Sequence, residues 1–115
     1  MKIHIKRVYE KPDESDGTRI LIDRLWPRGL SKGKAKVDIW LKDIEPSTGL
    51  RQWFGHDPAK WGEFKKRYVI EIKKNHQVLS QLENLLKEGT VTLVYGAKDE
   101  EHNDGVVLKE YLEKE

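Results

Sequence analysis

The sequence contains no cysteine among its 115 residues. This excludes disulfide bridges, a thiolate nucleophile and every metal or iron–sulfur site built on cysteine. No uninterrupted apolar run exceeds three residues, which is far too short to cross a membrane. The amino terminus reaches a basic pair before any long apolar stretch and does not have the pattern of a secretory signal. These absences predict a cytoplasmic protein that does not engage a membrane.

The chain also lacks a strong excess of either charge, since 22 basic residues stand against 20 acidic ones. A net charge of +2 is not the footprint of a typical nucleic-acid-binding protein. Four Trp, four Tyr and two Phe supply apolar surface for a core, which argues against disorder. The length favours a single domain spanning residues 1–115.

Apolar residues recur with strand and helix periods in turn along the chain. Strands are predicted at 2–9, 19–25, 37–44 and 90–95, and helices at 58–72, 76–87 and 104–112. The segment 37–44 also fits a helix, but the breakers Pro46 and Gly49 favour a short strand. The segment 90–95 (TVTLVY) is apolar enough to be an interior strand, flanked by 19–25 or 3–9.

This order of elements predicts an α/β domain with a small, mostly parallel sheet flanked by helices. We expect three layers, with helices on both faces of the sheet. A two-layer α+β sandwich is the alternative. In either case, polar residues that follow the strands are the first place to look for a site, because ligands of open α/β sheets bind at the carboxyl ends of the strands.

Basic residues are concentrated just after the strand predicted at 19–25. Between Arg24 and Val37 there are five basic residues and no acidic one. The planar guanidinium groups of Arg24 and Arg28 are suited to a phosphate or carboxylate, and Trp26 could stack on a ring. The alternative is a solvated basic loop in which Trp26 belongs to the core and Arg24 pairs with an acidic neighbour.

A second polar cluster, residues 95–103, follows the strand predicted at the centre of the sheet. We predict that Asp99 and His102 form a catalytic acid–base pair, with Lys98 as an electrostatic partner, because imidazole titrates near neutral pH. The same pair could supply two metal ligands, although we predict no metal site. The alternative is a charged helix cap with His102 on the surface. The sequence contains no HExxH, Walker, GxGxxG or GxSxG motif.

A third candidate segment, residues 51–68, is rich in aromatic residues at helical spacing, which is typical of a core face. His56 and Arg67 are its candidate ligand-binding residues. A histidine beside a helix start and close to Arg51 is suited to hold an anion or transfer a proton. The alternative for His56 is a local structural role next to the helix cap Asp57.

Three long segments together resemble the YeaO-like family of small bacterial and archaeal proteins of unknown function. They are DGTRILIDRLWPRG, PSTGLRQWFGHDPAKWGEFKKRYVIEI and TVTLVYGAKDEEHNDGVVLKEYL. The resemblance runs from Arg7 to Leu112 and implies one compact, cytoplasmic α/β domain with no established cofactor and no known reaction. One departure is the pair Asp104-Gly105, which stands where the family usually has an alanine before its last helix.

These observations predict that the protein binds a small anionic ligand, phosphorylated or nucleotide-like, through an Arg/Asp/His cluster at the strand ends. The predicted ligand-binding residues are Arg24, Trp26, Arg28, His56, Arg67 and Lys98. The sequence identifies no cofactor, no oligomeric state and no reaction, so it does not decide between binding and catalysis. The alternatives are a nucleic-acid-binding module that uses the basic Arg24–Lys36 loop, with weak binding expected, and a protein–protein interaction domain.

Overall fold

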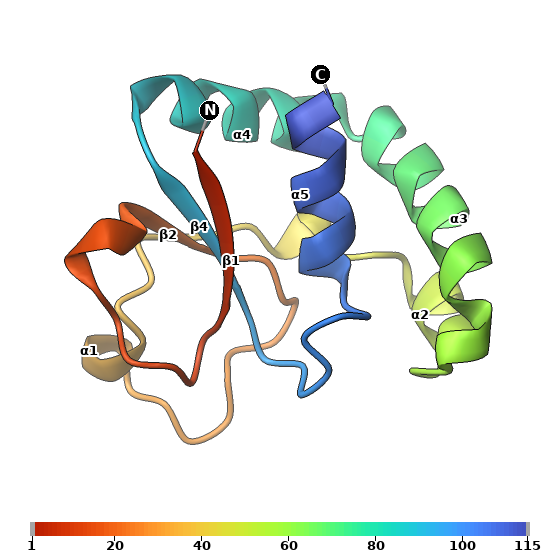
Figure 1. The fold of residues 1–115 in the computed structure, drawn as a ribbon, viewed down its shortest axis with the longest axis horizontal. Helices are drawn as coiled ribbons and strands as arrows, with labels where there is room; N and C mark the ends of the chain where they lie inside the picture. The colour runs from red at the N-terminus through yellow and green to blue at the C-terminus, as the bar shows by residue number, and fades with distance from the viewer. Residues whose placement is uncertain (1, 115) are drawn as a thin grey trace.

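Four parallel strands form the centre of the computed structural model, which describes residues 2–114. They are β1 (Ile3–Arg7), β2 (Thr18–Leu21), β3 (Ile39–Trp40) and β4 (Val91–Tyr95), in the spatial order β1-β4-β2-β3 (Figure 1). All five residues of β4 are buried and the strand pairs with both β1 and β2, which confirms the predicted interior strand. Because every pairing is parallel, the carboxyl ends of the strands meet at one edge.

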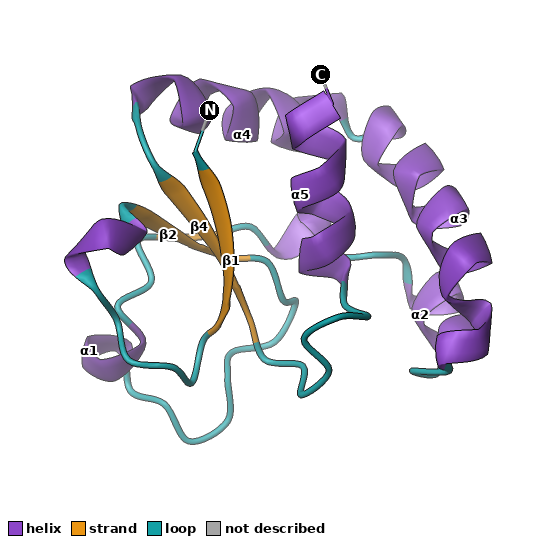
Figure 2. Cartoon of the chain, in the orientation of Figure 1, coloured by secondary structure: helices purple, strands orange, loops and turns teal. Residues whose placement is uncertain are grey.

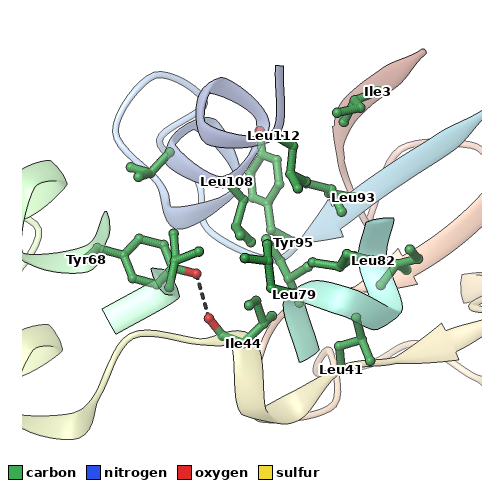
Figure 3. Close-up of a cluster of buried hydrophobic side chains, with 14 of the residues drawn as sticks. Ile3, Leu41, Ile44, Tyr68, Leu79, Leu82, Leu93, Tyr95, Leu108 and Leu112 are labelled. Atoms are coloured by element: carbon green, nitrogen blue, oxygen red, sulfur yellow. Dashed lines mark hydrogen bonds between the residues drawn. The ribbon is translucent and has the colours of Figure 1, made fainter. Parts of the chain in front are cut away.

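The four longer helices pack on one face of the sheet (Figures 1 and 2). They are α2 (Thr48–Phe54), α3 (Trp61–Lys74), α4 (His76–Glu88) and α5 (Asp104–Lys114). Their apolar residues form one cluster with strand residues such as Ile3, Leu93 and Tyr95 (Figure 3). Within this cluster the buried Tyr68 hydroxyl donates a 2.6 Å hydrogen bond to the Ile44 carbonyl oxygen, so its polar atom is satisfied.

The opposite face of the sheet is covered by the chain that joins β2 to β3. This segment contains a single turn of helix, α1 (Lys32–Ala35), and packs Trp26 and Leu30 against a small cluster that includes Leu21 and Val94. The structure therefore confirms the α/β class and the small parallel sheet. The second flanking layer is thin, because Pro27 and Gly29 interrupt any longer helix in this connection.

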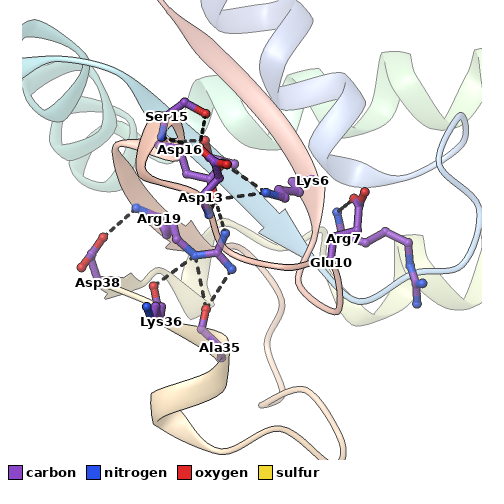
Figure 4. Close-up of polar contacts among 11 residues, drawn as sticks. Lys6, Arg7, Glu10, Asp13, Ser15, Asp16, Arg19, Ala35, Lys36 and Asp38 are labelled. Atoms are coloured by element: carbon purple, nitrogen blue, oxygen red, sulfur yellow. Dashed lines mark hydrogen bonds and ion pairs between the residues drawn. The ribbon is translucent and has the colours of Figure 1, made fainter.

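A buried ion pair lies on this second face, where β2 begins (Figure 4). Arg19 is 3% exposed, and its Nη1 lies 2.6 Å from Asp16 Oδ2. The remaining guanidinium N–H groups donate to the carbonyl oxygens of Ala35 and Lys36. Lys6 Nζ lies 3.2 Å from Asp16 Oδ1. The arginine thereby ties α1 to the sheet.

Some element boundaries differ from the sequence prediction. The predicted strand 19–25 ends at Leu21, where its pairing with β4 ends. The predicted strand 37–44 is extended only at Ile39–Trp40, because β2 offers it only Ile20 and Leu21 as partners at that edge. Three 3-10 turns occupy Glu14–Asp16, Lys42–Ile44 and Pro58–Lys60, the last of which precedes α3 in the predicted 58–72 helix. In residues 2–114, no helix combines the length and the apolar character needed to cross a membrane.

Candidate functional site

A pocket of about 530 Å³ lies at the edge of the sheet where the parallel strands end. Its lining comes from the segments that follow all four strands, together with residues of α2 and α3. This volume is typical of a site for a small organic molecule. The position is the one expected for a ligand of a parallel sheet, since it gathers loops that are far apart in the sequence.

Three carboxylates converge in this pocket, and we call them the acidic floor: Asp23 after β2, Glu45 after β3 and Asp104 at the start of α5. One oxygen of each lies within 4.8 Å of the others, and all three residues are half-buried. Burial, together with the charge of Glu45, raises the pKa of Asp23 to about 6. Burial, together with the charges of Asp23 and Glu45, raises the pKa of Asp104 to about 8. The three groups therefore do not all ionise at neutral pH.

Backbone donors hold two members of the acidic floor in place. The Gly96 N–H donates a 2.7 Å hydrogen bond to Asp23 Oδ2, and a Cβ at position 96 would lie only 3.1 Å from that oxygen. Glycine therefore allows the loop after β4 to approach the carboxylate closely. The Arg24 N–H donates to Glu45 Oε2, so Glu45 also fixes the start of the loop after β2.

The other carboxylate oxygen of Glu45 is incompletely satisfied. Glu45 Oε1 lies 3.0 Å from Arg51 Nε, which makes an ion pair. The Nε hydrogen is directed at the Pro46 carbonyl oxygen, 3.1 Å away. Glu45 Oε1 is buried, and this ion pair with Arg51 is its polar contact within residues 2–114, which provide it with no hydrogen bond.

A second group of pocket residues, the basic rim, consists of Arg28, His56 and His102. Arg28 and His56 are exposed, and the Arg28 carbonyl oxygen accepts a 2.9 Å hydrogen bond from the Tyr9 hydroxyl. His56 has a φ of 58°, a left-handed conformation that is uncommon for a residue other than glycine. It follows Gly55, whose φ of 53° ends α2, so the two residues turn the chain sharply beside the pocket.

His102 is held by two neighbours. Its Nδ1 lies 3.0 Å from Asp99 Oδ2, and its ring meets the ring of Trp61 edge-on at 5.2 Å. The backbone N–H groups of Glu101 and His102 donate to Asp99 Oδ1. These hydrogen bonds are the main reason why the pKa of Asp99 lies below its ordinary value. Asp99 thus organises the loop before α5 and orients the imidazole, while Asn103 caps the helix by accepting from the Val106 N–H.

Aromatic side chains complete the pocket. Phe54 and Phe64 stack on each other at 4.3 Å and both line it. Trp26 lines the pocket, is half-buried and packs edge-on against Trp40 at 5.5 Å. Its Nε1–H donates a 2.7 Å hydrogen bond to the Leu30 carbonyl oxygen. Trp26 therefore belongs to the smaller core cluster and at the same time forms a wall of the pocket.

The structure brings part of the predicted site together. Trp26, Arg28, His56 and His102 all line the pocket. Asp99 lies outside the lining but contacts it through His102.

The other predicted residues lie outside the lining. Arg24 is exposed and its Nη1 donates to Thr48 Oγ1 at 3.2 Å. Arg67 pairs with Glu63 at 3.0 Å and stacks over the Trp53 ring at 4.2 Å. Lys98 is exposed.

Comparison with known proteins identifies relatives over nearly the whole chain. A family model described as the inactive DUF488-N3 subclade matches residues 2–115. The uncharacterised protein YeaO of Escherichia coli (strain K12) is 40% identical, covering 97% of this chain and 97% of its own. The uncharacterised protein Rv3073c of Mycobacterium tuberculosis (strain ATCC 25618 / H37Rv) is 37% identical, covering 96% of this chain and 93% of its own. No solved structure matches.

Proposed function

This chain belongs to the family described as the inactive DUF488-N3 subclade, and from that premise we propose that it binds a small phosphorylated or nucleotide-like ligand. The observation that carries the proposal is the convergence of Arg28, His56 and His102 on one pocket at the carboxyl ends of a parallel sheet. A guanidinium fork and imidazole N–H groups are suited to phosphate oxygens. The word inactive in the family description favours binding over catalysis.

Each residue of the basic rim has a distinct role in this proposal. Arg28 extends from an exposed loop and binds the phosphate through its guanidinium group. His102 donates to Asp99 through Nδ1, so its Nε2 donates to a phosphate oxygen when the ring is in the imidazolium form. Asp99 is then a positioning residue, and the catalytic role predicted for the Asp99–His102 pair is not needed for binding. The cytoplasmic location expected from the sequence belongs to the same proposal.

Fewer structural features support the alternative that the protein binds nucleic acid. Lys32, Lys34 and Lys36 are exposed on and beside α1, on the side of the sheet opposite the longer helices. About three phosphate contacts give weak, strongly salt-dependent binding. The pocket, by contrast, offers a concave surface with aromatic walls and two kinds of polar group. We therefore propose the small ligand.

Replacing Arg28 with alanine should weaken the binding of D-ribose 5-phosphate about tenfold or more, because a charge-assisted contact to the phosphate is lost. The melting temperature should change little, since Arg28 is exposed and the substitution keeps its backbone carbonyl oxygen, which accepts the hydrogen bond from Tyr9. Isothermal titration calorimetry and a thermal melt measure the two quantities.

Arg67→Ala is the matched control, because Arg67 is also exposed but lies outside the pocket lining. Its affinity for D-ribose 5-phosphate should equal that of the unchanged protein. Equal affinities for the unchanged protein and Arg28→Ala would refute the role of Arg28. Failure of the unchanged protein to bind D-ribose 5-phosphate, adenosine 5′-monophosphate or inorganic phosphate would refute the proposed function.

A further inference from the structure

The acidic floor and the basic rim favour ligand groups of different charge. Arg28 and the two histidines attract an anionic group, whereas the acidic floor of Asp23, Glu45 and the largely protonated Asp104 repels one through its ionised carboxylates. All six residues line the same pocket of about 530 Å³. A ligand that satisfies both groups must therefore carry an anionic end and a second end of different chemistry, able to donate hydrogen bonds to carboxylates.

The geometry of the acidic floor suits hydroxyl groups. One oxygen from each carboxyl group lies within 4.8 Å of the others. A hydroxyl oxygen donates one hydrogen bond and accepts another, and two such bonds of about 2.8 Å span roughly 4.6 Å at a tetrahedral oxygen, so one hydroxyl can join a protonated carboxyl to an ionised neighbour. Glu45 Oε1, which is buried 3.0 Å from Arg51 Nε and accepts no hydrogen bond within residues 2–114, can accept from such a hydroxyl beside that ion pair.

The acidic floor offers a ligand both hydrogen-bond acceptors and a donor. The raised pKa of Asp104, about 8, leaves this group largely protonated at pH 7, while that of Asp23, about 6, leaves it largely ionised. A protonated carboxyl donates a hydrogen bond and an ionised one only accepts. Hydroxyl groups both donate and accept, so they match this set.

We propose that the ligand is a phosphorylated sugar whose adjacent hydroxyl groups bind Asp23, Glu45 and Asp104 while its phosphate binds Arg28. This inference rests on the proposed function and specifies the ligand class of the same pocket. Carboxylates recognise ribose hydroxyls in a comparable position in other parallel-sheet proteins, which shows that the contact is chemically sound. The aromatic walls formed by Trp26, Phe54 and Phe64 supply the apolar surface that sugar faces require.

The test compares D-ribose 5-phosphate with 2-deoxy-D-ribose 5-phosphate, which carries the same phosphate but lacks one of the adjacent hydroxyl groups. Affinities are measured by calorimetry at pH 7 in the presence of EDTA. The deoxy sugar should bind about tenfold more weakly or worse, because a site built to hydrogen-bond a hydroxyl rejects the analogue that lacks it. Asp23→Ala should reduce the preference between the two sugars to within about twofold.

Glu101→Gln is the matched control, since Glu101 is an exposed acidic residue of the loop before α5 that does not line the pocket. This variant should keep the full preference. If Asp23→Ala does not fold, the two sugars on the unchanged protein decide the question alone.

The outcomes separate the two proposals. Equal affinity for both sugars would overturn the hydroxyl inference and leave phosphate binding in place. Binding that appears only after Mg²⁺ or Mn²⁺ is added would also overturn it, in favour of a divalent cation on the acidic floor. No binding of either sugar or of inorganic phosphate would refute the proposed function itself.

Discussion

At pH 8 the Asp104→Asn variant should exceed the unchanged protein in free energy of unfolding by about 2–3 kcal/mol. Burial, aided by the charges of Asp23 and Glu45, makes the ionised form of Asp104 unfavourable in the folded protein and raises its pKa to about 8. Asparagine keeps the shape of the side chain and carries no charge at any pH. The substitution therefore removes the free-energy cost of holding an ionised carboxylate at this position in the folded protein at alkaline pH.

The sign of the pH dependence follows from the two raised pKa values. Both carboxyl groups have an ordinary pKa of 3.8, so the folded protein holds protons that the unfolded chain has released. Stability should fall as the pH rises above about 4, with the contribution of Asp23 lost by about pH 6 and that of Asp104 by about pH 8. The gain from Asp104→Asn should accordingly be smaller at pH 5 than at pH 8.

Urea denaturation at pH 5 and pH 8 measures these differences, with Glu101→Gln as a control that changes an exposed acid instead. The control should alter the free energy of unfolding by less than about 0.5 kcal/mol at either pH. An Asp104→Asn gain that is the same at both pH values, or a loss at pH 8, would show that Asp104 does not bear a charge penalty in the folded protein.

Arg19→Ala should lower the free energy of unfolding by about 3–5 kcal/mol, because it leaves a buried carboxylate without its closest partner. Arg19 Nη1 lies 2.6 Å from Asp16 Oδ2, and the arginine side chain is 4% exposed. The substitution also removes the donors that satisfy the carbonyl oxygens of Ala35 and Lys36. The connection between β2 and α1 depends on these bonds.

Arg67→Ala serves as the control for this effect, since Arg67 also pairs with a carboxylate at 3.0 Å but its side chain is 48% exposed. Arg67→Ala should lower the free energy of unfolding by less than about 1 kcal/mol, as is usual for exposed ion pairs. Urea denaturation at pH 7 measures the free energy of unfolding of both variants. Losses of similar size would mean that burial of the Arg19–Asp16 pair adds nothing to its contribution.

Local signals in the sequence were enough to predict most of the fold. The TVTLVY run is apolar at successive positions, as an interior strand must be, and it forms β4. The apolar spacing of residues 76–87 predicts a helix, and α4 runs from His76 to Glu88 with Leu79, Leu82 and Leu86 buried. The extent of β3 could not be predicted in the same way, because its length depends on the short stretch of β2 available for pairing.

The acidic floor could not be predicted from the sequence, for a different reason. Asp23, Glu45 and Asp104 come from three separate segments, and only the strand order and the start of α5 bring them together. A single carboxylate after a strand carries no signal of its own. The pair Asp104-Gly105, which departs from the resembled family pattern, was the one local clue. The charge of Arg67 and Lys98 makes them candidates for binding an anion, but side-chain type alone does not indicate which way a helix or loop faces.

The most direct test of the central claim is an NMR titration of the ¹⁵N-labelled protein with D-ribose 5-phosphate at pH 7. The proposed pocket predicts amide shift changes concentrated in residues 22–28, 54–56 and 96–104, which surround the acidic floor and the basic rim. Residues 32–36, on the opposite side of the sheet, should not respond. Shift changes centred on 32–36, or none anywhere at millimolar ligand, would contradict the claim that the strand-end pocket binds a phosphorylated small molecule.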